Sequence, residues 1–364
     1  MPLNRTIIHV VGARPNFMKA APVLRALAEN SLTQRLVHTG QHYDDKMSAI
    51  FFRQLNMPEP DLNLEVGSGS HAVQTAQIML RFEEVVLAQK PELVLVYGDV
   101  NSTVAAALVC AKLGVPIGHV EAGLRSFDRT MPEEINRVLT DQVADLLFTP
   151  SADGDQNLLR EGISREKIHL VGNVMIDTLV RLLPIAASRQ IDRDLKIVPN
   201  SYGLITLHRP SNVDDPDILK SILEVLMEVS QDLPLLFPVH PRTRARIKEW
   251  GLAVPSGGRL ELLEPQGYLD FLKLQMEAAV VVTDSGGIQE ETTYLGVPCL
   301  TMRENTERPI TVARGTNILV GQDMQRLKAE LARVLDGGAK RGQIPPLWDG
   351  RASERIAEVI ASYS

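Results

Sequence analysis

The chain has 364 residues, of which 44% are hydrophobic, and a formal net charge of −7. Two domains are expected at this length, because single hydrophobic cores stop growing at about 250–300 residues. The acidic balance argues against nucleic acid or an acidic membrane as the main partner, so any anion site must be built locally from a few basic groups.

Cysteine usage and hydropathy favour a cytoplasmic protein. Cys110 and Cys299 lie in separate apolar contexts and indicate core residues in a reducing cytosol rather than a disulfide. No apolar run reaches the length of a membrane span, and the first residues lack the apolar core of a signal peptide. No cysteine and histidine cluster has metal spacing, and no dinucleotide fingerprint occurs, so neither a metal nor a cofactor is expected.

Strand and helix patterns alternate in the first part of the chain. An apolar strand is predicted at residues 6–11, and Pro15 suits the first turn of a helix that begins near Phe17. Ser70 is a plausible N-cap for a helix over 71–88. The remaining predicted elements here are strands at 36–39, 93–97 and 117–120 and a helix at 102–113. This alternation with short turns predicts a mostly parallel sheet with helices on both faces.

The same alternation returns after residues 179–200, a charged stretch without strong strand signals. Strands are predicted at 204–207, 235–239 and 280–283. The sequence Leu-Gly-Val-Pro occurs at 113–116 and again at 295–298, and each copy closes a helix and opens a strand. We therefore predict two similar α/β domains with a boundary at about residues 173–200.

Chemically reactive side chains follow several of the predicted strands. In parallel α/β sheets, ligands bind beyond the carboxyl ends of the strands. Packing of a core alone does not explain this clustering, so the cleft between the two domains is the predicted site. The residues at strand ends are Arg14, Asp99, Glu121, His208, His240 and Asp284.

Two turns are candidates for anion binding. The turn at residues 12–15 directs Arg14, and Lys19 one helical turn later, toward an anion; the alternative is an ordinary turn with solvated basic residues. The turn Ser285-Gly286-Gly287 opens a helix, where free N–H groups and small residues admit a phosphate. The alternative is that Asp284 or Ser285 only caps this helix.

Three carboxylates lie near one another in the sequence. Glu121 directly follows an apolar strand, and a buried carboxylate there needs a partner: either Arg125 neutralises it, or it serves chemistry. Glu133 and Glu134 follow a proline at a helix start, where stabilisation of the helix dipole is the simpler explanation for at least one of them.

Other polar positions leave alternatives open. Asp99 is either a helix cap or a functional carboxylate, whereas His208 is interpreted as functional because a strand ends there. His240 is interpreted as structural or peripheral. One of Glu290 and Glu291 accepts hydrogen bonds from a ribose, or both merely favour the positive end of their helix.

Eight motifs follow one another along residues 10–316: GARPNFMK, YGDVNST, HVEAGLRS, PEEINR, VGNVMIDTL, DSGGIQEE, LGVP and MRENTERP. In this order they closely resemble the non-hydrolysing UDP-N-acetylglucosamine 2-epimerases. The resemblance implies two Rossmann-like domains with a deep interdomain cleft, as in B-type glycosyltransferases, and a homodimer. It implies one domain at 1–175, completed by a C-terminal helix at about 348–364, and a UDP-binding domain at 176–347.

The activity implied by the resemblance is reversible C2 epimerisation of UDP-N-acetylglucosamine to UDP-N-acetylmannosamine. UDP leaves and returns through a 2-acetamidoglucal intermediate, and the product supplies a surface polysaccharide. Alternatives are a 2-epimerase of a modified UDP-sugar such as a 2,3-diacetamido uronic acid, a hydrolysing epimerase, a glycosyltransferase on the same fold, and a silent UDP-sugar sensor.

Residues of the family motifs map onto this chain one by one. The acid/base residues implied by the resemblance are Asp99, Glu121, Glu133 and His208. The UDP contacts that it implies are Arg14, Lys19, Gln266, Phe271, Ser285, Gly287, Glu291 and Arg308.

The chain departs from the family pattern in two regions. His208 is followed by Arg-Pro-Ser-Asn where Arg-Arg-Glu-Asn is common. Residues 41–44 read Gln-His-Tyr-Asp where many members have Gln-His-Arg, and residues 67–70 lack an expected arginine. These last two segments resemble a region where some relatives bind a second, activating UDP-sugar, so we predict that this regulatory site is absent or altered.

Overall fold

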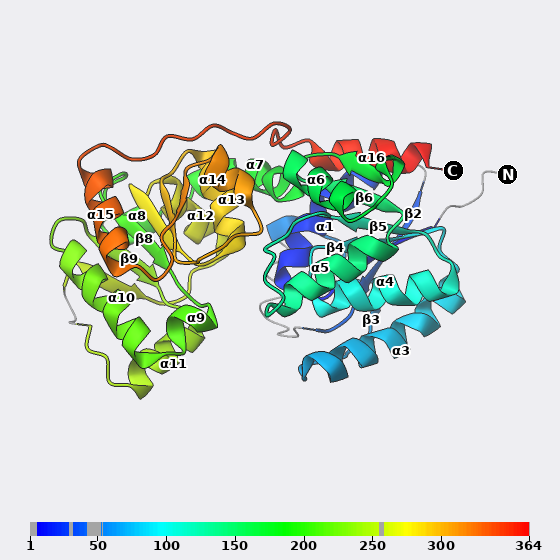
Figure 1. The fold of residues 1–364 in the computed structure, drawn as a ribbon, viewed down its shortest axis with the longest axis horizontal. Coiled ribbons are helices and arrows are strands. Elements are labelled where there is room, and N and C mark those ends of the chain that lie inside the picture. Colours follow the sequence, from blue (N-terminus) through cyan, green and yellow to red (C-terminus); the bar gives the residue numbers. More distant parts are fainter. Residues whose placement is uncertain (1–5, 29–31, 42–51, 53, 255–257, 364) are drawn as a thin grey trace. The chain divides into compact units, whose positions relative to one another are not determined.

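The computed structural model describes residues 6–28, 32–41, 52, 54–254 and 258–363. The chain divides into two compact units: unit 1 contains residues 1–178 and 346–364, and unit 2 contains residues 179–345. Each unit is built on one parallel sheet with helices on its faces (Figure 1). This architecture confirms the predicted α/β class with two Rossmann-like sheets.

Unit 1 has a seven-stranded sheet in the order β3-β2-β1-β4-β5-β6-β7, and all its strand pairs are parallel. Both faces are covered, so the central strands are continuous apolar runs; all five residues of β4 are buried. The strands are β1 (Thr6–Val11), β2 (Thr33–His38), β3 (Leu62–Asn63), β4 (Leu93–Tyr97), β5 (Ile117–Val120), β6 (Leu146–Thr149) and β7 (Ile168–Leu170).

The last segment of the described chain belongs to unit 1, where α16 packs against α1 (Figure 1). The Trp348 indole donates to the carbonyl of Pro150 at 3.0 Å. Asp177 accepts the N–H groups of Ala352 at 3.0 Å and Ser353 at 2.7 Å, and thereby caps α16. The helices are α1 (Arg14–Ala28), α3 (His71–Gln89), α4 (Asn101–Leu113), α5 (Pro132–Val143), α6 (Ala152–Arg160), η1 (Arg165–Lys167), α16 (Ala352–Ser362) and α7 (Val174–Ala187), of which the residues from Leu179 onward belong to unit 2.

Unit 2 has a six-stranded parallel sheet in the order β10-β9-β8-β11-β12-β13. Its main core packs apolar side chains of β8, β9 and β11 against α10 and α15. The strands are β8 (Gly203–Thr206), β9 (Leu235–Pro238), β10 (Leu260–Leu263), β11 (Val280–Thr283), β12 (Cys299–Thr301) and β13 (Asn317–Leu319). The helices are α8 (Ile191–Asp194), α9 (Pro210–Val213), α10 (Pro216–Val229), α11 (Pro241–Glu249), α12 (Tyr268–Met276), α13 (Gly286–Leu295), α14 (Pro309–Ala313) and α15 (Met324–Leu335).

Several predicted boundaries are confirmed, and others shift by a few residues. The predicted bounds of β1, β4, β5 and β11 agree with the structure, and Ser70 caps α3 by accepting the N–H of Val73. The first helix begins at Arg14 rather than near Phe17, because the turn after β1 is shorter than the sequence suggests. Pro15 then stands at the second helical position, where its missing N–H still costs no intrahelical bond.

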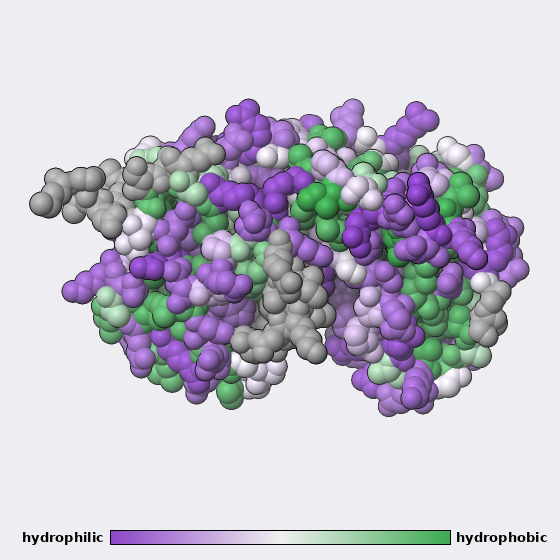
Figure 2. Space-filling model, turned by 180° about the vertical axis from the view of Figure 1, so that it is seen from behind, coloured by the Kyte–Doolittle hydropathy of each residue, from purple (hydrophilic) through white to green (hydrophobic). Residues whose placement is uncertain are grey.

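Polar residues cover most of the face drawn in Figure 2, with smaller hydrophobic patches between them. Within the described part of the chain, no helix combines the length and apolar character needed to cross a membrane.

Candidate functional site

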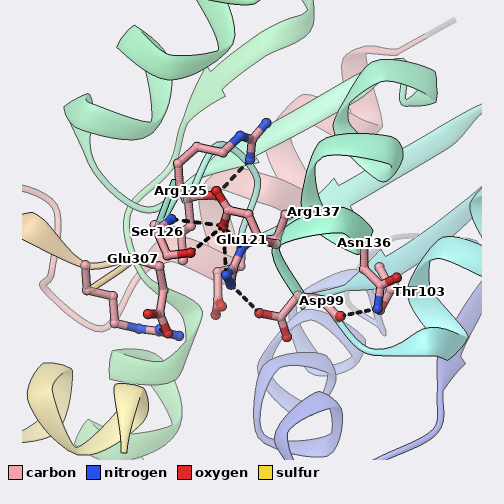
Figure 3. A network of polar contacts seen from close by, with 12 residues as sticks. Asp99, Thr103, Glu121, Arg125, Ser126, Asn136, Arg137 and Glu307 are labelled. Atoms are coloured by element: carbon pink, nitrogen blue, oxygen red, sulfur yellow. Dashed lines mark hydrogen bonds and ion pairs between the residues drawn. The ribbon is translucent and has the colours of Figure 1, made fainter. Parts of the chain in front are cut away.

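Asp99 lies in the turn after β4, which Gly98 forms with a φ of +62°. One carboxylate oxygen of Asp99 is 2.6 Å from Nη1 of Arg137, and the Asp99 carbonyl accepts from the Asn136 side chain (Figure 3). The N-cap of α4 is Val100, so the alternative that Asp99 caps this helix is wrong. Its carboxylate remains partly exposed and is oriented by an arginine on α5.

Glu121 follows β5 with a φ of +75°, a conformation that is uncommon for a residue other than glycine. Its carboxylate is 2.8 Å from Nζ of Lys19, and both side chains are almost fully buried. Arg125 pairs instead with Asp141 and Glu161, each at 2.7 Å. The alternative that Arg125 neutralises Glu121 is therefore wrong, and Lys19 has this role.

The two glutamates at the start of α5 have different environments. Glu134 is buried, accepts the N–H of Ser126 at 2.9 Å and of Phe127 at 2.8 Å, and pairs with Arg137 at 3.0 Å. Glu133 is half-buried and lines a pocket. Glu134 therefore holds the loop at Ser126 and Phe127, whereas Glu133 faces the pocket. The sequence alone left open which of the two has which role.

A polar pocket of about 250 Å³ in unit 1 brings Asp99 and Glu133 together. Within the pocket wall, Gln41 uses its side-chain oxygen to accept the N–H and hydroxyl of Ser102, at 3.0 and 2.6 Å. The other lining residues are Ser68, Gly69, His71, Gln74, Val100, Asn101, Pro132 and Asn136.

Part of the segment expected to differ at a regulatory site, residues 42–44, lies outside the described residues. Gln41, in the same segment, is committed to the start of α4 through Ser102. The absence or alteration of a regulatory site stays a prediction.

The start of α1 is closed by its own side chains. Asn16, which sequence reasoning missed, accepts the N–H groups of Gly12 and Ala13, each at 3.1 Å, and donates to the Tyr97 carbonyl. A Cβ on Gly12 would lie 2.0 Å from the Ser102 hydroxyl. Arg14 is exposed at this turn, so an anion here would meet its guanidinium rather than the backbone N–H groups of Gly12 and Ala13.

The start of α13 is open by comparison. Ser285 is the N-cap, but its side chain makes no capping hydrogen bond. A Cβ on Gly287 would meet nothing within 4 Å, whereas a Cβ on Gly286 would lie 2.5 Å from Nη1 of Arg308 and 2.7 Å from Oε1 of Glu307. First-turn N–H groups without a side-chain cap attract anions, and Arg308 lies against the same turn.

Asp284 supports the loop after β8 instead of capping α13, so the alternative that it caps is wrong. Its carboxylate accepts the N–H groups of His208 and Arg209, at 3.0 and 2.8 Å, and the side chain of Asn212 at 3.1 Å. The carboxylate is also 3.0 Å from Nδ1 of His208. Burial alone would raise the pKa of Asp284, but hydrogen bonds and charge from His208 outweigh it and the pKa is lowered.

His208 lies beside His240, with ring centroids 5.7 Å apart. His240 begins α11, where its Nδ1 accepts the N–H of Arg242 at 3.2 Å. Burial lowers the pKa of His240, and the neighbouring His208 and Arg242 lower it further. His240 is therefore a structural cap that also adjoins a predicted functional residue.

The remaining predicted nucleotide contacts lie on and around α12 and α13. Glu290 pairs with Arg308 at 2.9 Å, and Glu291 accepts from the hydroxyl of Tyr268 at 2.8 Å. Gln266 donates to the Glu264 carbonyl ahead of α12, and Phe271 is partly buried against a core cluster of unit 2. Sequence reasoning missed Tyr268 and Arg137; the spacing of Arg137 three residues after Glu134 is a signal that could have identified it.

Comparisons with known proteins extend this description over the whole chain. The family model for UDP-N-acetylglucosamine 2-epimerase matches residues 25–361. A protein of Methanocaldococcus jannaschii with the same name is 44% identical over 96% of this chain and 97% of its own. A Pseudomonas aeruginosa protein named UDP-2,3-diacetamido-2,3-dideoxy-D-glucuronate 2-epimerase is 43% identical over 98% of this chain and 99% of its own.

Solved structures agree with these sequence matches. The M. jannaschii epimerase in complex with UDP-GlcNAc and UDP has a TM-score of 0.90 at 43% identity, covering 98% of this chain and 100% of that chain. The glycotransferase of kitacinnamycin, at 13% identity and a TM-score of 0.59, shares the fold alone.

The fold and the carboxylates at the strand ends define a two-unit α/β enzyme with the architecture of B-type glycosyltransferases. The chain belongs to the UDP-N-acetylglucosamine 2-epimerase family, and epimerases are isomerases. Among the described residues, no group of three or more histidine, cysteine, aspartate or glutamate side chains is arranged to hold a metal ion.

Proposed function

We propose that this chain reversibly converts UDP-N-acetylglucosamine into UDP-N-acetylmannosamine. The observation that carries the proposal is the near-complete match to the M. jannaschii epimerase solved with UDP-GlcNAc and UDP. Two features of the structure support it. The carboxylates at the sheet edge of unit 1 suit proton transfer, and the start of α13 in unit 2, which has no side-chain cap, suits a diphosphate.

The chemistry requires UDP to leave during the reaction. The hydrogen on C2 of the sugar is barely acidic, since no carbonyl is adjacent to it, and direct abstraction would give an unstabilised carbanion. Loss of the C2 proton together with cleavage of the C1–O bond instead gives 2-acetamidoglucal and UDP. Protonation of the opposite face of C2 and return of UDP to C1 then give the other epimer.

Unit 2 supplies most of the groups proposed to hold UDP. The start of α13 at Gly286 and Gly287 has no side-chain cap, and Arg308, which pairs with Glu290, lies against the same turn; both features support diphosphate binding here. Charge-assisted hydrogen bonds of this kind stabilise a departing diphosphate. The proposed contacts also include Arg14, Lys19, Gln266, Phe271, Ser285 and Glu291.

Unit 1 supplies three of the four residues proposed for proton transfer: Asp99, Glu121 and Glu133. Asp99 and Glu133 line one pocket, whereas Glu121 is paired with Lys19. The 2.8 Å contact with Lys19 fixes the position of the buried Glu121 carboxylate, which suits a group that transfers a proton. We assign His208, oriented by Asp284 in unit 2, to stabilising the leaving diphosphate or moving a proton.

The test is the fate of the C2 hydrogen. Purified protein is incubated with UDP-N-acetylglucosamine in deuterium oxide, without acceptor or redox cofactor, and followed by NMR. The proposal expects both epimers to form and to carry deuterium at C2. Epimers without label would exclude elimination, and free N-acetylmannosamine with UDP would indicate a hydrolysing enzyme.

A second candidate substrate is a UDP-2,3-diacetamido uronic acid. The P. aeruginosa relative with that named activity is as similar in sequence as several relatives named for UDP-N-acetylglucosamine. Turnover of both UDP-sugars side by side in the NMR assay decides between them.

We also propose a cytoplasmic homodimer that supplies a surface polysaccharide. Free, buried cysteines suit the cytoplasm. On α3, Val73, Leu80 and Leu87 follow one another at seven-residue intervals and expose 57–60% of their surface, a pattern that suits a second copy of the chain. The double variant Leu80→Asp with Leu87→Asp should be a monomer in light scattering. Leu159→Asp, at another exposed leucine on α6, is the control and should remain a dimer. A double variant that remains a dimer contradicts this interface.

A further inference from the structure

A buried hydrogen-bonded pair, His119 with Asp141, connects two of the proposed catalytic loops. His119 is the third residue of β5 and Asp141 is on α5; the side chains of both are fully buried. Nδ1 of His119 is 2.6 Å from Oδ1 of Asp141. Neither residue belongs to the groups proposed above to touch the substrate.

The histidine side of the pair holds the Asp99 loop. Nε2 of His119 is 2.8 Å from the carbonyl oxygen of Gly98, the residue before Asp99. A carbonyl has no hydrogen to donate, so Nε2 must carry one. The other nitrogen, Nδ1, faces the Asp141 carboxylate, which also contacts Arg125, so both ring nitrogens of His119 have a polar partner.

The aspartate side of the pair holds the Glu121 loop. Oδ2 of Asp141 accepts the N–H of Gly123 at 3.1 Å and contacts Nη1 of Arg125 at 2.7 Å. Gly123 packs so closely that a Cβ there would lie 2.5 Å from the Gly154 carbonyl oxygen. Glu121 itself has a φ of +75°, and such a conformation persists only where neighbouring contacts fix it.

We propose that His119 and Asp141 are positioning residues that set the separation of the Asp99 and Glu121 carboxylates. One continuous chain of hydrogen bonds runs from Gly98 through His119 and Asp141 to Gly123, so the two loops cannot shift independently. The proposal rests on the proposed function, because it gives Asp99 and Glu121 their roles.

The expected signature is a loss of turnover without a loss of nucleotide binding. Misplacement of reacting groups by about 1 Å lowers rates by about 100-fold. The proposed UDP contacts lie mainly in unit 2, on α12, α13 and the segment at Arg308, whereas the hydrogen bonds of His119 join it to Asp141 and Gly98 within unit 1. KM and the Kd for UDP should therefore change by less than about threefold when kcat falls about 100-fold.

The experiment compares His119→Gln, Asp141→Asn and the double variant with wild type. Glutamine cannot donate to both acceptors, and asparagine cannot accept from all three donors. If the pair acts as one unit, the double variant should be no slower than the worse single variant. His169→Gln, on β7 of the same sheet, is the control and should retain wild-type kcat.

A merely structural role would lower Tm while leaving kcat per folded enzyme within about threefold of wild type, and that result overturns the proposal. Multiplicative losses in the double variant overturn it too. If the variants do not fold, ¹⁵N-histidine NMR of the wild-type protein decides: a proton on Nε2 of His119 is required, and its absence refutes the bond to Gly98. Wild-type protein without epimerase activity would instead refute the proposed function.

Discussion

Gly286 and Gly287 are neighbours in the first turn of α13, and an added methyl group would have opposite effects at the two positions. At Gly286 the new Cβ would lie 2.5 Å from Nη1 of Arg308 and 2.7 Å from Oε1 of Glu307. Arg308 cannot simply move away, because its Nε is held by Glu290 at 2.9 Å. At Gly287 the new Cβ would meet no protein atom within 4 Å.

The magnitudes follow from these surroundings. Overpacking of a filled site costs about 1–3 kcal/mol, which exceeds the gain of at most about 1 kcal/mol from replacing glycine by alanine in a helix. Gly286→Ala should therefore lower Tm, and Gly287→Ala should raise it by about 2–4 °C. If a diphosphate lies against this turn, the Gly287→Ala methyl group occupies its space and weakens UDP binding about tenfold or more.

The assay measures Tm without ligand and the Kd for UDP by calorimetry, on both variants and wild type. Gly287→Ala should be more stable than wild type yet bind UDP more weakly, a combination that general damage to the fold cannot produce. Unchanged UDP affinity in Gly287→Ala would refute the placement of the diphosphate. An unchanged Tm in Gly286→Ala would refute the argument that Arg308 is fixed.

Three further predictions concern other parts of the molecule. Glu133→Gln should lower kcat about 100-fold at near-normal Tm. Glu134→Gln, which weakens the hydrogen bonds from Ser126 and Phe127 and the ion pair with Arg137, should lower Tm by several degrees. The reverse pattern would contradict the roles given to the two glutamates. Burial raises the pKa of Cys110 to about 12 and of Cys299 to about 11, so neither thiol should react with Ellman's reagent at pH 8 until the protein unfolds, and rapid native labelling is the contrary result. The pKa of Asp284 in the folded protein is lowered from its ordinary value of 3.8. The carboxylate therefore stabilises the fold fully above pH 3.8 and loses this effect as pH falls through the lower, folded pKa. Asp284→Asn should accordingly lose Tm less steeply than wild type between about pH 5 and 2, and equal slopes would exclude this contribution.

The strands and the edge of the sheet that carries the site could be predicted from the sequence, because both depend on local patterns. Continuous apolar runs such as that of β4 identify buried parallel strands, and polar residues directly after them identify the carboxyl edge. The bounds of β2 and the start of α1 were less predictable, since turn length depends on contacts such as those of Asn16 with Gly12 and Ala13.

Side-chain partners could not be predicted, because they depend on residues far apart in the chain. Glu121 lies only four positions before Arg125 in sequence, yet it pairs with Lys19, 102 positions away. Asp284 precedes the cap position of α13, yet its donors come from His208, Arg209 and Asn212. In each case, the strand arrangement of the sheet rather than sequence proximity selects the partner.

Unit 1 is discontinuous in sequence: residues 346–364, which follow the whole of unit 2 along the chain, return to it. Without α16, the buried carboxylate of Asp177 would lose the N–H groups of Ala352 and Ser353, and each unmet buried group costs about 1–3 kcal/mol. A nascent chain that ends before residue 346 can complete the core of unit 2 while unit 1 still lacks a helix against α1. Removal of residues 346–364 should consequently destabilise unit 1 more than unit 2.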